Sequence, residues 1–402
     1  GLRPLRYTIT SDELFFAGSE TGMIKIPEEK IVEKGKLGPG QIIAIDLKKG
    51  KLFKDKEIKD LLAKDYKKYN KQIIDLEKKI SNENEKPNFT SEDLRKRQYL
   101  SGLSVEDLEL ILHPMAEEGK EASGSMGDDT PVAVLSSHFR PVSHYFRQNF
   151  SQVTNPPIDS LRENKVMSLK TRFGNLGNIL DFDNLTEENI YVLDSPILTN
   201  SQFKKFKKFF SKKTKIIDCT FDISSSLKDR IEQIREEAET SVRQGSTCLI
   251  LSDQNISNHK ASIPSILVVG AVHSHLVKHG LRGYCSLNVE CSDALDTHSF
   301  AVLIGVGATT VNPYLAIDSI YQRFEKKLFG KSDFESCVVK FKKSIDAGLL
   351  KIMSKMGISV ISSYRGGCNF EAVGLSRAIV SDYFPGMSSR ISGIGVIGIE
   401  KK

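Results

Sequence analysis

The sequence predicts an α/β fold, with a parallel-sheet or barrel-like (β/α) domain preceded by a short β-rich segment. Three observations predict it. Between about residues 130 and 365, short and nearly continuous apolar segments recur, as expected of strands that are buried on both faces. Amphipathic helical patterns lie between several of them, and strands that alternate with helices form parallel sheets. Residues 1–55 instead carry short apolar segments separated by glycines, which is typical of strands and turns.

The chain changes character after residue 55. From 56 to 80, apolar residues recur at steps of three or four among lysines and acids, which predicts an amphipathic helix. The polar segment 81–87 ends in Pro87 and marks a linker or a helix boundary.

Two short helices are predicted within 88–112. Thr90-x-x-Asp93 matches the capping-box pattern, with Asp in place of the usual Glu. Ser104-x-x-Asp107 repeats the same pattern before the second helix.

The β/α region follows. The predicted strands are Val132–Ser136, Ile190–Leu193, Lys215–Cys219, Thr247–Ser252, Ile266–Gly270, Ser286–Glu290, Ala301–Gly305 and Ile358–Ile361. A helix is predicted from Leu227 to Arg243, because apolar residues recur there at helical spacing and Gly245 is a suitable C-cap. Eight strands are enough for a barrel, but their number does not establish closure.

Composition restricts the functional classes. The chain has 402 residues and 39% hydrophobic residues, so it is long enough for more than one domain and a sizeable core. The net charge of +6 is spread along the chain, whereas nucleic-acid binders concentrate charge on one face. No apolar segment reaches the roughly 20 residues of a membrane helix. No signal peptide is recognisable, and the six dispersed cysteines are typical of reduced thiols. We therefore expect a cytoplasmic protein without nucleic-acid or membrane partners.

Several predicted strands end in polar residues, namely Asp194-Ser195, Asp218, Ser252-Asp253 and Glu290. The carboxyl ends of parallel strands carry the active sites of α/β folds. Asp and Ser also cap turns, and this second interpretation is the better supported one.

Three histidines form the pattern His273-x-His275-x-x-x-His279. On a helix, His275 and His279 share one face while His273 points away. A zinc site needs further ligands, and none is evident, so the sequence favours a structural role and predicts no metal.

Two glycine motifs were weighed as phosphate sites. Gly393-x-Gly395-x-x-Gly398 matches the dinucleotide fingerprint, but that motif requires a strand before it and a helix after it, and the flanking sequence predicts neither. The segment 124–131 (GSMGDDTP) is a specified turn whose acids would repel phosphate. Residue chemistry alone therefore predicts no catalytic, cofactor-binding or metal-binding residue.

Several long segments nevertheless resemble the large subunit of glutamate synthase. They are 124–136 (GSMGDDTPVAVLS), 149–159 (NFSQVTNPPID), 269–277 (VGAVHSHLV), 305–316 (GVGATTVNPYLA), 348–359 (GLLKIMSKMGIS) and 370–375 (FEAVGL). They occur in the family's order and span most of the chain. The segment Ser252-Asp253-Gln254 departs from the family, which usually has SDR there.

The resemblance implies four segments. Residues 1–55 would end a class II glutamine amidotransferase domain, and 56–87 would form a helical linker. Residues 88–385 would form the central domain, similar to an FMN barrel that binds no flavin. Residues 386–402 would begin the FMN-binding synthase domain.

The resemblance also implies a function for the parent enzyme, which makes L-glutamate from L-glutamine and 2-oxoglutarate in ammonia assimilation. FMN, a 3Fe–4S cluster and the nucleophilic cysteine would lie outside this segment, so we expect the segment alone to be inactive. Its implied partners are the rest of the large subunit and, for electrons, an NADPH-oxidising small subunit or ferredoxin.

The segment would link the glutaminase and synthase sites and help enclose the ammonia path. Thr154 and Asn155, in a V-T-N-P-P turn, are the candidate residues of that path, because a hydroxyl and an amide donate and accept hydrogen bonds. A rigid turn before two prolines is the simpler interpretation. Two other hypotheses for the function of this chain stay open. It could be a stand-alone scaffold or split subunit of the same complex, or an independent barrel enzyme that uses the acids at the strand ends.

Overall fold

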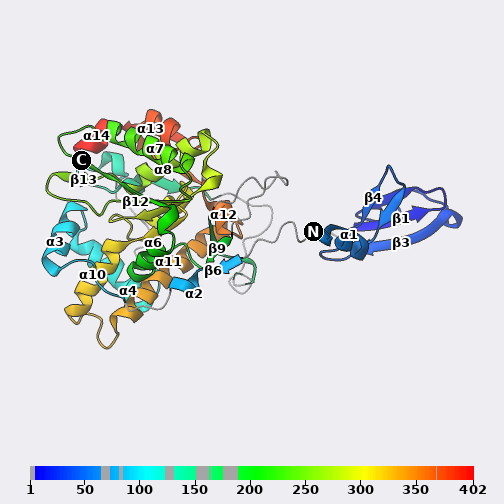
Figure 1. The fold of residues 1–402 in the computed structure, drawn as a ribbon, viewed down its shortest axis with the longest axis horizontal. Helices are drawn as coiled ribbons and strands as arrows, with labels where there is room; N and C mark the ends of the chain where they lie inside the picture. The colour runs from blue at the N-terminus through cyan, green and yellow to red at the C-terminus, as the bar shows by residue number, and fades with distance from the viewer. Residues whose placement is uncertain are drawn as a thin grey trace. The chain divides into compact units, whose positions relative to one another are not determined.

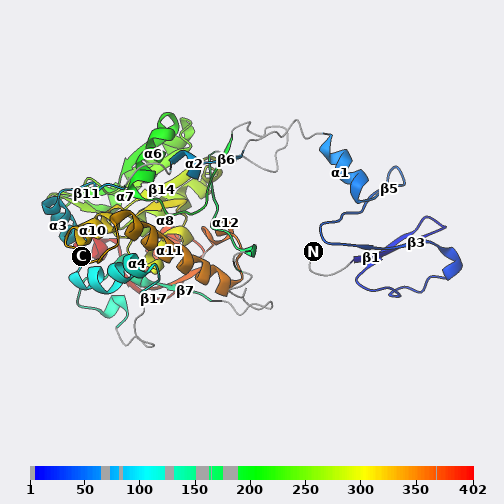
Figure 2. The ribbon, with the colours of Figure 1, turned by 90° about the horizontal axis from the view of Figure 1, so that it is seen from below.

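The computed structural model describes residues 5–64, 73–80, 85–122, 131–150, 163, 165–174, 189–367 and 369–402. The chain forms two compact units, residues 1–70 and residues 71–402. Each unit is described by itself, and Figures 1 and 2 label their helices and strands.

The first unit is β-rich, as predicted. Strand β1 (Leu5–Thr10) pairs antiparallel with β2 (Phe15–Gly18) and with β3 (Ile31–Leu37). The other elements of this unit are a 3-10 turn (Glu28–Lys30), the hairpin of β4 (Ala44–Asp46) and β5 (Lys51–Phe53), and helix α1 (Asp55–Ala63).

A glycine shapes the face of this antiparallel sheet. The ring of Tyr7 lies across Gly35, where a Cβ would come within 2.1 Å of the tyrosine Cζ. The Tyr7 hydroxyl donates to Glu33 Oε1 at 2.8 Å, and its ring stacks on Phe15 with 5.7 Å between the centroids. Thr10 is the only residue buried among the described residues 5–64, so this unit has almost no core of its own.

The second unit is built on a four-stranded parallel sheet in the order β10-β12-β14-β15. These strands are Thr214–Asp218, Cys248–Ser252, Ser286–Glu290 and Thr310–Asn312. Helix α7 (Leu227–Arg243), α8 (Ser265–Lys278) and α9 (Thr297–Gly305) connect them in turn. A single parallel bridge from Ile197 to Val311 continues the pattern beyond β15. The predicted α/β class with a parallel sheet is confirmed.

Helix α7 has the bounds that the sequence predicts. The Ser226 side chain accepts a hydrogen bond from Asp229 N at its start, and Ile231, Ile234 and Ala238 are buried along one face. After Gln244, Gly245 adopts a positive φ of 95°, a conformation that glycine adopts without strain. Helix α7 packs against α8, which also contacts α13 (Arg377–Tyr383), and Figure 1 shows the three gathered on one side of β12.

The remaining elements complete the second unit. Its other strands are β6 (Ile73–Asp75), β7 (Phe146–Gln148), β8 (Thr171–Phe173), β9 (Ile190–Leu193), β11 (Thr220–Asp222), β13 (Lys260–Ser262), β16 (Phe370–Leu375) and β17 (Ser388–Ile394). Its other α-helices are α2 (Glu77–Ile80), α3 (Ser91–Leu100), α4 (His113–Glu118), α6 (Asn200–Phe209), α10 (Tyr314–Glu325), α11 (Phe334–Met356), α12 (Ile361–Tyr364) and α14 (Val396–Lys401). Its 3-10 and π turns are Asp107–Leu112, Ala133–Leu135, Val142–Tyr145, Ser211–Lys213 and Arg282–Tyr284.

Four predicted strands are wrong. Ile266–Gly270 lies in α8 and Ala301–Gly305 in α9. Both helices are buried almost all round, so their sequences lack the polar face that distinguishes a helix from a buried strand. Val132–Ser136 contains a 3-10 turn, and within Ile358–Ile361 a single bridge at Val360 precedes α12.

The predicted helix over 56–80 is also wrong as one element. Within its described residues, α1 ends at Ala63, β6 follows at Ile73–Asp75, and α2 begins at Glu77. Strand β6 pairs in parallel with β9, and Leu76 and Ile80 are buried in a cluster with Phe203 and Phe206 of α6. Tertiary packing therefore overrides the helical spacing of these residues.

Both predicted capping patterns in 88–112 are present. Thr90 Oγ1 accepts a hydrogen bond from Asp93 N at 3.3 Å, at the start of α3. Ser104 Oγ accepts one from Asp107 N at 3.0 Å. Within the described ranges, no helix is both long and apolar enough to cross a membrane.

Candidate functional site

The carboxyl ends of the parallel strands bring polar side chains into one row. Asp218 pairs with Ser252, and Ser252 with Glu290, in the register of the sheet. Glu290 in turn pairs with Asn312. The polar residues that end β10, β12, β14 and β15 therefore follow one another in register at one edge of the sheet.

Glu290 is the centre of this row and is 4% exposed. Its Oε1 accepts from Lys207 Nζ at 2.7 Å and from Gln254 Nε2 at 3.0 Å. Its Oε2 accepts from Ser252 Oγ at 2.7 Å. Protein donors therefore bind both oxygens of this carboxylate.

Asp253, which follows Ser252, is 2% exposed. Its Oδ2 accepts from Ser292 Oγ at 2.6 Å and from Ser262 Oγ at 2.9 Å. Its Oδ1 is buried without a hydrogen-bond partner in the described part of the chain. Burial, with the nearby Asp293 carboxylate, raises the pKa of Asp253 to about 6.

A second buried chain of polar groups extends from Asn312, a residue that the sequence analysis missed. Asn312 Nδ2 donates to Asn200 Oδ1 at 3.0 Å, and Asn200 Nδ2 donates to Asp318 Oδ1 at 2.7 Å. Burial raises the pKa of Asp318 to about 7. The sequence signal for this residue is the pair Asn312-Pro313 after a short apolar segment.

Three predicted strand-end residues do not join this network. Asp218 faces the next turn, where its Oδ1 accepts from Thr220 Oγ1 at 2.8 Å and its Oδ2 from Asn255 Nδ2 at 3.1 Å. Although burial raises it, these hydrogen bonds hold the pKa of Asp218 below its usual value. Asp194-Ser195 follows β9, and Ser195 Oγ donates to Asp346 Oδ1 at 2.7 Å.

A cavity of about 710 Å³ lies beside this edge. It is lined by Asp293 and Asp296 and by parts of the segments 100–107, 138–145 and 394–402. Asp293 Oδ2 accepts from Ser265 N at 2.9 Å, at the start of α8. Asp296 Oδ1 accepts from Ser299 N at 2.9 Å, at the start of α9. Both carboxylates therefore accept hydrogen bonds at helix N-termini, where a negative charge stabilises the helix.

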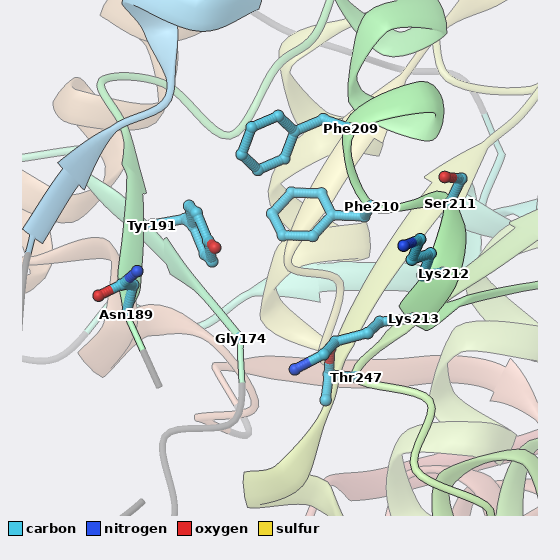
Figure 3. A pocket seen from close by; sticks show the side chains of 9 residues that line it. All are labelled: Gly174, Asn189, Tyr191, Phe209, Phe210, Ser211, Lys212, Lys213 and Thr247. Atoms are coloured by element: carbon cyan, nitrogen blue, oxygen red, sulfur yellow. The ribbon is translucent and has the colours of Figure 1, made fainter. Parts of the chain in front are cut away.

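A second cavity, of about 450 Å³, lies near the opposite ends of the strands, where Lys213 and Thr247 precede β10 and β12. Figure 3 shows the rings of Tyr191, Phe209 and Phe210 grouped on one side of it. This grouping is an aromatic cluster, because the Tyr191 and Phe210 rings meet edge to face at 5.0 Å.

The histidines separate as predicted. His273 is internal to the fold, and its Nδ1 accepts from Arg282 Nε at 3.1 Å. Burial, together with Arg282 and Arg365, lowers the pKa of His273 to about 3. His275 and His279 share the other face of α8, with 4.3 Å between their ring centroids.

The glycine fingerprint has a context that the sequence analysis misjudged. Strand β17 precedes it and α14 follows it. A Cβ on Gly393 would lie 2.3 Å from the carbonyl oxygen of Gly374, so close packing of β17 against β16 explains this glycine. Thr154 and Asn155 lie outside the described residues, as do residues 124–130.

Comparison with known proteins identifies the family. A model of the glutamate synthase central domain matches residues 96–376. The chain belongs to this family. A second model, of class II glutamine amidotransferases, matches residues 1–71.

Relatives of the glutamate synthase family match along the whole chain. The NADPH-dependent glutamate synthase large chain of Azospirillum brasilense is 56% identical over 100% of this chain and 27% of its own length. The ferredoxin-dependent glutamate synthase 2 of Synechocystis is 38% identical over 99% of this chain and 27% of its own length. The chain therefore spans about a quarter of the length of the curated relatives it matches. Among solved structures, the flavin-binding domain of baker's yeast flavocytochrome b2 is 11% identical over 76% of this chain and 94% of its own, with a TM-score of 0.36, a likeness that decides nothing.

The described residues do not fit the cofactors that glutamate synthases are expected to carry. The phosphate of FMN needs backbone N–H groups or cations, whereas the strand ends present carboxylates that are already bound to protein donors. An iron–sulfur cluster needs several thiolates together. The described cysteines are buried and unpaired, and within the described residues none belongs to a group of three metal-ligating side chains.

Proposed function

We propose that this chain is an internal part of a glutamate synthase large chain that performs no step of the chemistry itself. The parent enzyme would convert L-glutamine, 2-oxoglutarate, two electrons and two protons into two molecules of L-glutamate. The family match over residues 96–376 supports the proposal, as do the large chains that match the whole sequence.

The observation that carries the non-catalytic role is the state of the strand ends. Glu290 is bound to Lys207, Gln254 and Ser252, and Asp253 is 2% exposed. Hydrogen-bonded polar networks such as that of Glu290 stiffen the interior that contains them. We infer that this edge keeps the domain rigid, so that it holds the glutaminase and synthase sites of the parent enzyme at a fixed separation.

We further propose the segment boundaries 1–55, 56–87, 88–385 and 386–402 for the amidotransferase end, the linker, the central domain and the start of the synthase domain. FMN and a 3Fe–4S cluster would be bound by the parent enzyme outside this chain. Electrons would come from NADPH through a small subunit, or from ferredoxin. Relatives of both kinds match this chain, so membership of the family is compatible with either donor.

Thr154 and Asn155 remain our candidates for the ammonia path. Ammonia that escapes into water is protonated and loses its nucleophilicity, so an enclosed path preserves it. Thr154→Val in the full-length enzyme should raise glutamine hydrolysis relative to glutamate formed from 2-oxoglutarate. An unchanged ratio of the two rates would remove Thr154 from the path.

The proposal is tested by comparing the purified 402-residue chain with the full-length large chain. We expect the chain to bind no flavin and to show no turnover, while the full-length protein shows both. An antibody against this chain should also detect a native polypeptide several times longer. A native polypeptide of about 402 residues would instead support a split subunit, and turnover by the chain alone would contradict the proposal.

A further inference from the structure

Helices α7 and α8 bring three metal-ligating side chains together. Glu239 on α7 lies beside His275 and His279 at the end of α8. One ligand atom from each residue lies within 4.8 Å of the other two. The sequence placed the two histidines on one face, but the third ligand comes from a different helix and is evident only in the folded chain.

We propose that Glu239, His275 and His279 bind a divalent transition-metal ion of the zinc class, with water completing its coordination. Two imidazole nitrogens and one carboxylate oxygen form a ligand set that zinc uses in proteins. Nitrogen ligands favour zinc, copper or nickel over magnesium and calcium, which prefer oxygen.

The distances between the ligand atoms suit such an ion after small movements. Glu239 Oε2 lies 2.6 Å from His275 Nε2 and 3.7 Å from His279 Nδ1. Metal–ligand bonds of about 2.0–2.2 Å in tetrahedral geometry place ligand atoms about 3.3 Å apart. These two contacts therefore each have to change by less than about 1 Å, and the ligand atoms of the two histidines lie within 4.8 Å of each other. Any proton between His275 Nε2 and Glu239 Oε2 would leave as the ion enters.

The surrounding residues leave the coordinating oxygen available. Arg243 Nε donates to Glu239 Oε1 at 2.8 Å, on the other carboxylate oxygen. His279 Nδ1 now lies 2.9 Å from the carbonyl oxygen of His275, and it would give up this contact on binding the ion.

Rigid helices support the cluster, and solvent reaches it. On the inner faces, Ala238 and Val242 of α7 and Val272 and Leu276 of α8 are buried, so the backbone positions of the ligands are fixed by packing. The side chains of Glu239, His275 and His279 keep 22%, 18% and 35% of their surface exposed. An ion therefore has an entry path and room for water ligands.

The test measures zinc binding by the full chain after treatment with a chelator and its removal. Zn²⁺ is titrated in competition with a chromophoric chelator, with Mg²⁺ as the comparison ion. We expect one Zn²⁺ site that Mg²⁺ does not fill, and we expect Zn²⁺ to raise the melting temperature. His279→Gln and Glu239→Gln should each weaken this site by about 10–100-fold or more and abolish the thermal shift.

His259→Gln is the matched control, because His259 is exposed on a different segment and should leave the zinc affinity unchanged. His279 lies at an exposed helix end, so the His279→Gln variant should keep the circular dichroism spectrum of the unsubstituted chain. If the unsubstituted chain does not bind Zn²⁺ at micromolar free concentration, the proposal is overturned. Equal Zn²⁺ affinity of the parent and both ligand variants would also overturn it.

Discussion

The two units of this chain bury very different shares of their apolar side chains. In the first unit, Met23, Val32 and Leu47 are 68%, 68% and 88% exposed, and Thr10 alone is buried among its described residues. In the second unit, Phe300 and Phe341 are 0% and 1% exposed within one large cluster. A small antiparallel sheet without a core gains little stability from itself, so we expect the stability of the chain to reside in its second unit.

The comparison also bears on the family assignment. An exposed apolar surface usually marks a region that packs against another surface. The first unit matches class II glutamine amidotransferases over residues 1–71. We expect the remainder of such a domain to cover these side chains in the parent protein.

The largest test of the comparison shortens one apolar side chain in each unit. Phe300→Ala should lower the free energy of unfolding of the second unit by about 3–5 kcal/mol, because the ring is fully buried against Phe341. Val32→Ala, in the first unit, should change it by less than about 0.5 kcal/mol. Urea titration followed by circular dichroism measures both. Similar losses for the two variants would show that the first unit shares the core.

The next effect concerns the ion pair at the strand ends. Lys207→Met should cost about 2–3 kcal/mol, because it leaves Glu290 buried without its cation, while the partial exposure of Lys207 keeps the loss below that of a fully buried pair. Lys207→Met combined with Glu290→Gln should cost clearly less than Lys207→Met alone. The same urea titration measures the two variants, and equal costs would mean that the charge pair is not what holds this edge.

The third effect is a dependence on pH. Burial raises the pKa of Asp318 to about 7, above the unfolded value of about 3.9. Between these values the folded chain holds a proton that the unfolded chain has lost, so the free energy of unfolding falls as pH rises. The slope from this residue should reach about 1.4 kcal/mol per pH unit at most. Asp318→Asn should flatten the profile between about pH 4 and 7, and an unchanged slope would assign it to other groups.

The smallest effect is that of a helix cap. Asp333 accepts a hydrogen bond from Ser336 N at 2.7 Å, at the start of α11. Asp333→Ala should therefore cost about 1 kcal/mol, measured as a shift of the urea midpoint. Ser332→Ala, one residue earlier, keeps this bond and should have a much smaller effect. Equal shifts for the two variants would argue against the cap.

Several features of the fold could be predicted from the sequence, because they are encoded in neighbouring residues. Helix α7 shows apolar residues at helical spacing and a cap at each end, and β14 was placed at its observed bounds. The prediction of strands within α8 and α9 was wrong because burial on all sides of a helix removes the periodic signal. The prediction of a helix at β6 was wrong because the strand that pairs with β6, β9, lies more than a hundred residues away.

In the candidate sites, too, contacts between neighbouring strands were easier to predict than contacts with helices. The sequence placed Ser252 and Glu290 at the ends of predicted parallel strands, and the sheet register pairs them. It did not predict Lys207 as the partner of Glu290, or Glu239 as the partner of His275. Both partners come from helices whose packing angles no local pattern encodes.

The most direct test of the central claim measures the activity of the full-length large chain that carries Lys207→Met together with Glu290→Gln. If the strand ends are structural, glutamine-dependent glutamate formation should keep its kcat within about twofold, since the paired charges are removed together. A loss of about 100-fold or more, in a protein that remains folded, would be the size expected for a lost acid or base. That result would place chemistry at Glu290 and contradict the account.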